Sequence, residues 1–205
     1  MNSADGLLGL LRARRSVRRF KPDQVDRAVL ERLVEAAAWA PSAGNRQDWL
    51  FTVVTSAQVR ARMAEAVRER WREIIEANRS QGYAEGLESY AAAYAMFPEA
   101  PAVAVVSVRV TSLVQKRMFG TEAGATAGGV ASAAMAAQNL MLAACAQGLA
   151  SCCMTGALVA GPKIAELAGL GRKQEIVCLV ALGWPAEVPP APPRKPLEEI
   201  ARFVE

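Results

Sequence analysis

The side chains best suited to binding a ligand near the start of the chain belong to RRSVRRF, residues 14–20. In an extended backbone, Arg14, Ser16 and Arg18 would share one side, and Val17 would lie on the other. Two guanidinium groups flanking a hydroxyl group suit a compact dianion such as a phosphate monoester. A charge run is also typical of a surface that only faces water, so the stretch alone leaves both interpretations open.

A second polar stretch, APSAGNRQDW at residues 40–49, contains residue types that favour a loop with exposed backbone amides. Asn45 offers a hydrogen-bond donor and acceptors in one plane, which suits the edge of a planar heterocycle. By itself, however, the stretch is more typical of an ordinary turn.

The composition limits the chemistry that these stretches can serve. The chain has 205 residues, 52% of them hydrophobic, so we expect one domain over residues 1–205 with a sizeable core. It contains no histidine, which excludes Ser-His-Asp and Cys-His triads and nearly all His-ligated zinc sites, and we expect no metal site. An enzyme of this composition would therefore depend on a cofactor for its chemistry.

Charge and cysteine content indicate where such a protein works. The net charge of +4 is well mixed after the basic start, with no basic tract interleaved with aromatics, which argues against nucleic-acid binding. No secretion signal is visible at the N-terminus, and the four cysteines have no CxxC spacing. We therefore expect free, mostly buried thiols in a cytoplasmic protein.

Helices and strands must position the two polar stretches. Hydrophobic periodicity predicts helices over residues 5–14, 25–40, 56–78 and 86–98. Continuous apolar runs predict buried strands over residues 50–55, 100–110 and 175–183. This order favours an α+β or α/β sandwich.

Residues 123–162 contain no charged side chain, so a membrane span has to be considered. The segment is rich in Ala, Gly and Ser and is interrupted by Gln138, Asn139 and Gln147, which makes it weakly hydrophobic for a span. We favour a helix buried against a second copy of the chain, where the small residues would let two backbones approach closely.

The C-terminal tail has six prolines within residues 185–196. Such a segment cannot be helical through Pro196 and is typical of an extended arm lying on a surface. From the sequence alone, a simple linker and an arm that clasps a partner subunit are equally consistent with it.

Taken together, these motifs resemble the nitroreductase family. RRSVRRF, an amphipathic helix, APSAGNRQDW and the strand LFTVV resemble its start. AAQNLMLAACAQGLASC at residues 136–152 resembles its central helix and the Gly-Leu turn that follows. VALGWP at 180–185 and RKPLEEI at 194–200 resemble its last strand and C-terminal arm. The motifs cover nearly the whole chain in the family's order and spacing.

The resemblance implies a fold and an assembly. The fold is an α/β sandwich of the α+β class, with a central, mostly antiparallel sheet flanked by helices. Two chains intertwine as a homodimer, with the arm of about residues 185–205 extending onto the partner, and bind two FMN molecules at the subunit interface. The implied activity is hydride transfer from NAD(P)H to FMN by ping-pong kinetics, followed by reduction of a nitroaromatic, quinone or similar acceptor.

The resemblance also implies site residues, none of which is a side-chain catalyst because the flavin carries the chemistry. The FMN phosphate would be held by Arg14, Ser16, Arg18 and, from the arm, Arg194 and Lys195. The flavin ring would be lined by the backbone of Arg15, by Thr155 and Gly156 near N5, and from the other subunit by Pro41, Ser42, Ala43, Asn45 and Ser132.

Departures from the family pattern leave the substrate open. Asp48 stands where many members have proline, and Thr155 stands where many have glutamate. Alternatives are a specialised relative that carries out dehalogenation or flavin fragmentation, and a non-catalytic flavin-binding protein. By family analogy the aromatic residues Tyr83, Tyr90, Tyr94, Phe97 and Phe119 would form a lid, although such residues are more often core.

The adjacent Cys152 and Cys153 form a further pair of reactive side chains. They could form a vicinal disulfide or a redox relay, but at a turn they are more typical of small packing residues.

Overall fold

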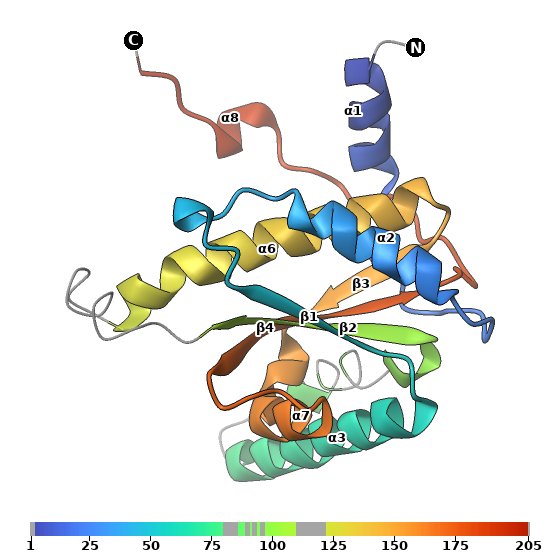
Figure 1. Cartoon of the computed structure of the whole chain (residues 1–205), viewed down its shortest axis with the longest axis vertical. Helices are drawn as coiled ribbons and strands as arrows, with labels where there is room; N and C mark the ends of the chain where they lie inside the picture. Colours follow the sequence, from blue (N-terminus) through green and yellow to red (C-terminus); the bar gives the residue numbers. More distant parts are fainter. Residues whose placement is uncertain are drawn as a thin grey trace.

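The computed structural model of the chain describes residues 3–79, 86–88, 91, 94, 97–109 and 122–204. A four-stranded sheet lies between two layers of helices (Figure 1). Helices α2 and α6 cover one face of the sheet, and α3 and α7 cover the other. This is the α+β sandwich that the resemblance implies.

The sheet contains β1 (Trp49–Val54), β2 (Ala102–Arg109), β3 (Ala150–Met154) and β4 (Gln174–Gly183), in the order β1-β2-β4-β3. All three neighbouring pairs are antiparallel, as expected. The strands predicted over 50–55, 100–110 and 175–183 are confirmed to within two residues at each end, apart from residue 110, which lies outside the described residues. The edge strand β3 was not predicted, because the sequence pattern indicated only a turn there.

The described helices are α1 (Ser3–Ala13), α2 (Arg27–Ala38), α3 (Ala57–Asn78), α6 (Glu122–Ala146), α7 (Gly161–Leu167) and α8 (Leu197–Ile200). The Ser56 hydroxyl begins α3 by accepting a hydrogen bond from the Val59 amide at 3.4 Å. Short 3₁₀ turns span Ala43–Asn45 (η1), Phe97–Glu99 (η3) and Gly156–Ala160 (η4). The helix predicted over 86–98 falls largely outside the described residues, and its last part is η3.

The core has two parts because side chains alternate along each strand. On β2, Val103 and Val105 face α3, whereas Ala104 and Val106 face α2 and α6. All four are fully buried. The sheet is therefore covered on both faces, and sites for ligands have to be found at its edges and along its outer helices.

Helix α6 is buried along one side and uncovered along the other. Ala133, Ala136 and Leu140 are completely buried against the sheet, while Val130 and Met135 keep 38% and 41% of their surface exposed. Among the described residues, Ala127–Ala146 is long and apolar enough to cross a membrane by length and composition, a property that core helices share. Its contact with the sheet makes α6 a core helix with one uncovered apolar face.

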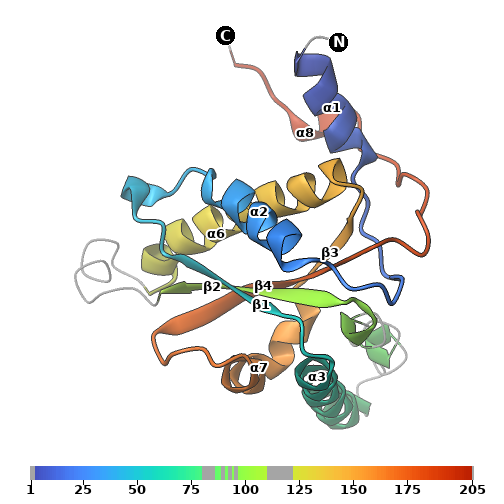
Figure 2. The same ribbon diagram turned by 45° about the vertical axis from the view of Figure 1, so that its right-hand side comes forward.

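The two ends of the chain project from the body on the same side (Figures 1 and 2). Helix α1 leaves Leu7, Leu8 and Leu11 about half exposed. The tail from 187 to 196 has neither helix nor strand, as predicted, and it leads to the exposed α8. Apolar side chains on both projections are thus uncovered in the single chain.

Candidate functional site

The basic segment RRSVRRF is extended along the free edge of β3. Ser16 pairs with Ser151 in a parallel bridge, and the Val17 amide donates to the Ser151 carbonyl at 3.1 Å. On the other side of the segment, the Ala186 amide donates to the Arg19 carbonyl at 3.0 Å. The segment is therefore fixed between an edge strand and the start of the C-terminal arm.

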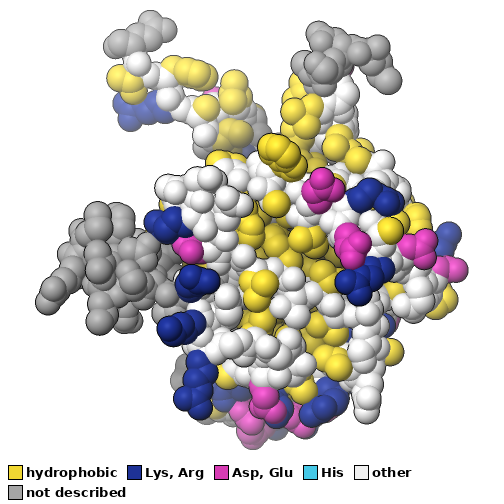
Figure 3. All heavy atoms as spheres, in the orientation of Figure 1, with side chains coloured by type: hydrophobic (Ala, Val, Ile, Leu, Met, Phe, Trp, Pro, Cys, Tyr) yellow, Lys and Arg dark blue, Asp and Glu magenta, His cyan; other side chains and the backbone are white. Residues whose placement is uncertain are grey.

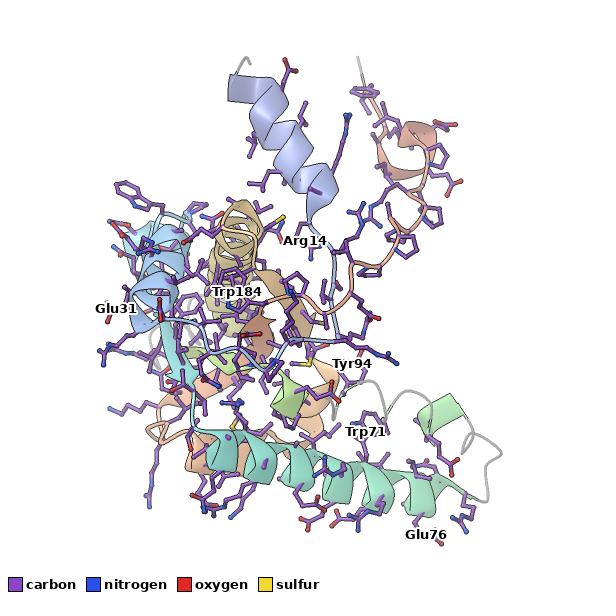
Figure 4. The ribbon with its side chains drawn as sticks, turned by 90° about the vertical axis from the view of Figure 1, so that its right-hand side faces the viewer. Arg14, Glu31, Trp71, Glu76, Tyr94 and Trp184 are labelled. Atoms are coloured by element: carbon purple, nitrogen blue, oxygen red, sulfur yellow. The ribbon has the colours of Figure 1, made fainter. Side chains whose placement is uncertain are left out.

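This backbone gives the predicted alternation of side chains. Val17 is 4% exposed, whereas Arg14 and Ser16 are half-buried and Arg18 is exposed. Among the described residues, the Arg14 side chain has no hydrogen-bond or ion-pair partner, and Arg18 makes one long contact with the Ser16 carbonyl at 3.5 Å. Two guanidinium groups are thus available to an anion. Figure 4 shows Arg14 where the chain leaves α1.

The other two arginines of the segment are used locally. One nitrogen of Arg15 donates to the carbonyls of Arg12 at 2.5 Å and Arg14 at 2.8 Å, which satisfies groups at the C-terminal end of α1. Arg19 lies 3.9 Å from Glu187, with 72% of its side chain exposed. Arg19 therefore faces water.

The turn after β3 is held rigidly from the α3 side of the sheet. The Trp71 Nε1 donates to the Gly156 carbonyl at 3.2 Å, and the Leu158 amide donates to the Thr155 carbonyl at 2.9 Å. A Cβ atom on Gly156 would lie 2.5 Å from the Tyr94 ring, so only glycine fits. Figure 4 shows Tyr94 and Trp71 between the sheet and α3. The backbone at Gly156 is therefore fixed in position.

Of the expected lid aromatics, Phe97 is 1% exposed and belongs to the core, so that expectation is wrong for this residue. Its side chain is enclosed by the cluster between the sheet and α3. Tyr94 is half-buried against Gly156. Tyr83, Tyr90 and Phe119 lie outside the described residues.

The loop of residues 41–47 has an unusual backbone. Gly44, Asn45 and Gln47 have φ angles of 61°, 51° and 50°, in the left-handed region that non-glycine residues rarely adopt. Ser42 supports this shape by accepting a hydrogen bond from the Gln47 amide at 3.1 Å. The side chains of Pro41, Ala43 and Asn45 are exposed, so they are available to a ligand from outside the chain.

Ser132 and Asp48 anchor the two ends of this loop. The Ser132 hydroxyl accepts from the Ala43 amide at 3.2 Å and donates to the Gly128 carbonyl at 2.6 Å. The Asp48 carboxylate pairs with Arg46 at 2.7 Å, and its carbonyl accepts from the amide of Arg109 in β2. Ser132 is only 4% exposed, so in a single chain it positions the loop rather than meeting a ligand.

One chain does not bring the loop to the basic segment. The loop contacts α6 at Ser132, and a cavity beside Arg14 is lined by Cys145 of the same helix. At 1.5 Å per residue these two points are about 20 Å apart, and Figure 1 shows η1 and α1 near opposite ends of α6. The cavity holds about 170 Å³, less than the ~300–1,000 Å³ of ordinary ligand pockets.

The C-terminal arm carries the last predicted phosphate contacts. Arg194 and Lys195 are both exposed, and the Lys195 ammonium lies 3.5 Å from the Glu199 carboxylate. Lys195 is therefore partly engaged on the arm itself, while Arg194 is the freer of the two cations.

The cysteines are all free thiols, but they differ in exposure. Cys152 and Cys178 are buried, Cys145 is half-buried, and Cys153 is exposed. The prediction of a packing role therefore holds for Cys152, whose pKa is raised by burial. It is wrong for Cys153, because β3 directs adjacent side chains to opposite faces of the sheet. Sequence reasoning missed this because it predicted no strand there.

Comparison with known proteins identifies the family to which the chain is similar. The sequence profile of the Nitroreductase family matches residues 11–184. The chain is 46% identical to 5,6-dimethylbenzimidazole synthase from Rhodobacter capsulatus over 57 residues, which make up only 28% of either protein. It is 28% identical to iodotyrosine deiodinase from Hydra vulgaris over 198 residues, which cover 93% of this chain and 70% of that protein.

Solved structures agree with this result. A BluB-like flavoprotein from Clostridium difficile 630 superimposes with a TM-score of 0.83 over 97% of this chain and 99% of that chain, at 23% identity. A variant of the FMN and NADPH-dependent nitroreductase NfnB from Sphigopyxis sp. strain HMH gives 0.72 over 96% and 97%, at 28% identity. By sequence and by fold, the chain belongs to the Nitroreductase family.

Proposed function

We propose that the protein is an FMN-dependent oxidoreductase that works as a cytoplasmic homodimer. When bound, FMN would supply the redox chemistry, which is hydride transfer from NAD(P)H followed, after that donor leaves, by reduction of a nitroaromatic, quinone or similar acceptor. Family membership supports the oxidoreductase class, and the similarity to the FMN and NADPH-dependent NfnB supports both the cofactor and the electron donor.

The observation that carries the proposal is the unused positive charge at the edge of β3. Arg14 and Arg18 flank Ser16 on an extended backbone that is fixed on both sides. Charge-assisted hydrogen bonds from two guanidinium groups are the interactions by which proteins grip phosphate. The donor set therefore fits the phosphate end of FMN, with Arg194 as a further contact from the arm.

The rigid turn at Thr155 and Gly156 fits the other end of the cofactor. It follows β3 directly and lies four residues beyond Ser151, about 13 Å along a strand from the phosphate contacts. Trp71 and Tyr94 hold the Gly156 backbone in place, so a backbone amide there can donate to flavin N5 without reorganising.

A second copy of the chain would complete the site. Between residues 127 and 135, the exposed residues of α6 form a stripe at helical spacing, which consists of Ala127, Val130, Ala131, Ala134 and Met135. If two α6 helices pack antiparallel with the Ser132 region of one chain beside the Cys145 end of the other, the loop of one chain meets the basic segment of the other. Pro41, Ser42, Ala43 and Asn45 would then line a flavin ring whose phosphate is held by the partner.

The projecting ends of the chain support the same assembly. Ile200, Phe203 and Val204 on the C-terminal arm are 66–87% exposed in the single chain. Burying such side chains against a partner removes apolar surface from water, at roughly 25 cal/mol per Å². We therefore assign the arm to the partner's surface rather than to a simple linker.

A specialised reaction is the second candidate, because two relatives point to it. Iodotyrosine deiodinase matches over most of this chain, and 5,6-dimethylbenzimidazole synthase matches a shorter part. Many family members carry a carboxylate at the turn proposed to face the flavin, and Thr155 in its place leaves that turn without one. Dehalogenation and flavin fragmentation are therefore the specialised reactions to test.

Anaerobic reduction tests the proposed class of reaction. We expect the purified protein to be yellow and excess NADH or NADPH to bleach its flavin. Added quinone or nitroaromatic should then restore the colour. Flavin that stays oxidised with both donors, yet bleaches with dithionite, would identify a non-catalytic flavin-binding protein. Bleaching without reoxidation by either acceptor would favour the specialised reactions, and iodotyrosine is the first substrate to try.

A further inference from the structure

Cys153 and Cys178 form a thiol pair on one face of the sheet. In the antiparallel ladder, Cys153 lies opposite Val180, so Cys178 is its diagonal neighbour, two residues further along β4. Both face the α6 side, and Cys178 is part of the core there. The two thiols interact, and Cys153 is the exposed member of the pair.

The charge around this pair favours one particular proton distribution. The hydrogen bond from Cys178 lowers the pKa of Cys153 to about 7, helped by the positive charge of Arg14 and opposed by burial. The same hydrogen bond, together with burial, raises the pKa of Cys178. Of the two thiols, Cys153 is therefore the one that ionises more readily.

The position of Cys153 relates the pair to the proposed flavin site. It lies on β3 between Ser151, which bridges to Ser16, and the turn at Thr155 and Gly156. A cofactor that reaches from the Arg14 and Arg18 side chains to the Gly156 amide must pass over the β3 residues between them. The exposed side chain in that interval is Cys153.

We propose that Cys153 is a reactive thiolate in the floor of the flavin site, open to soft electrophiles in the cofactor-free protein and covered when FMN binds. The covering by FMN rests on the proposed function, whereas the reactivity does not. In the reaction with iodoacetamide, the Cys153 proton first passes to water. The sulfur lone pair then forms an S–C bond as the C–I bond breaks and iodide leaves.

Alkylation of the flavin-free full-length protein tests the reactivity. At pH 7, an ordinary exposed thiol is about 3% thiolate, whereas a thiol with a pKa near 7 is about half thiolate. A less basic thiolate is also a weaker nucleophile, so the net gain in the rate of alkylation is about threefold. Peptide mapping by tandem mass spectrometry should therefore find iodoacetamide on Cys153 first. Equal or faster labelling of the half-buried Cys145 would overturn the assignment.

Two variants at Cys178 separate ionisation from accessibility. Cys178→Ala removes the donor, so Cys153 should react about threefold more slowly at pH 7 but up to about fivefold faster at pH 9.5, where Cys153 is ionised in both proteins and the more basic thiolate is the better nucleophile. Cys178→Ser keeps a hydroxyl donor and should behave like the unmodified protein. A change in the same direction at both pH values would contradict a role through the pKa of Cys153.

Labelling with and without FMN tests whether the bound cofactor covers Cys153. In protein reconstituted with FMN, and washed to show that the flavin is retained, Cys153 labelling should fall at least about tenfold while Cys145 labelling stays unchanged. Unchanged Cys153 labelling with FMN bound would overturn the position of Cys153 under the cofactor. Failure to bind FMN at all would overturn the proposed function and the covering together, whatever the reactivity in flavin-free protein.

Discussion

Helices α3 and α6 are the longest described helices, lie on opposite faces of one sheet, and differ in what covers their outer surfaces. On α3, Glu65 pairs with Arg68 and Arg72, and Arg70 pairs with Glu73, all at 2.6–3.1 Å. Figure 3 shows charged side chains gathered at the lower edge of the molecule, where α3 runs. The outer stripe of α6 is entirely uncharged.

The inner faces of the two helices are alike. Met63 and Val67 of α3, and Ala136 and Leu140 of α6, are completely buried against the sheet. The difference is therefore confined to the outside, where α3 presents charged side chains and α6 presents an uncharged apolar stripe. A charged outer surface suits a helix that faces water, whereas an uncovered apolar stripe is the surface that the proposed dimer would bury.

The largest effect should come from placing a carboxylate on each outer surface in turn. Ala134 on α6 and Ala61 on α3 are both exposed alanines inside long helices. Ala134→Glu would bury two unpaired charges in the proposed dimer, so we expect its dissociation constant to rise at least about a hundredfold. Ala61→Glu should leave the assembly unchanged. Sedimentation velocity measures both, and a dimeric Ala134→Glu variant would remove α6 from the interface.

Cavity-forming substitutions on the inner faces test whether α3 and α6 contribute equally to the core. Leu140→Ala on α6 and Met63→Ala on α3 each remove a completely buried side chain. We expect each to lower the free energy of unfolding by about 2–5 kcal/mol. Urea denaturation at fixed protein concentration measures this, and a negligible loss for Leu140→Ala alone would mean that α6 does not contribute to the core as α3 does.

Charge reversal on the basic segment tests whether this segment binds the FMN phosphate. Arg18→Glu turns an attractive contact with the phosphate into a repulsive one, so we expect FMN affinity to fall about a hundredfold while the dimer persists. Arg19→Glu makes the same charge change at a residue that faces water beside Glu187, and it should bind FMN nearly normally. Fluorescence titration with FMN compares them, and equal losses would contradict the specific role of Arg18.

The smallest effect should come from the ion pairs on α3. The hydrogen bond from Arg68 lowers the pKa of Glu65, so this carboxylate contributes stability above the pKa of an unfolded glutamate and loses it as pH falls. Because the group is exposed to solvent, Glu65→Gln should shift the unfolding temperature at pH 7 by less than about 2 °C. The two proteins should converge below about pH 4, as calorimetry across that range can show.

Much of the fold follows from sequence pattern, and the exceptions have physical reasons. The strands β1, β2 and β4 contain apolar runs long enough to predict a strand from the local sequence, and α2 and α3 follow helical periodicity. The strand β3 reads ASCCM, which combines small residues of modest strand propensity. Its conformation depends on pairing with β4, and a tertiary contact of this kind is invisible in a short local pattern.

The candidate site was predictable to a similar extent. The alternation of Arg14, Ser16 and Arg18 about the buried Val17 follows directly from an extended backbone. The positions of Phe97 and Cys153 do not, because one depends on the packing beneath η3 and the other on the pairing of β3. The separation of loop and basic segment along α6 likewise becomes visible only when the fold is known.

In the proposed assembly, two chains together hold two FMN molecules, with the uncovered face of α6 between the chains. Native mass spectrometry of the full-length protein, incubated with excess FMN and desalted, tests it most directly. The predicted result is a complex with the mass of two chains and two FMN molecules. A single chain without flavin, or a dimer that retains none, would rule out this assembly.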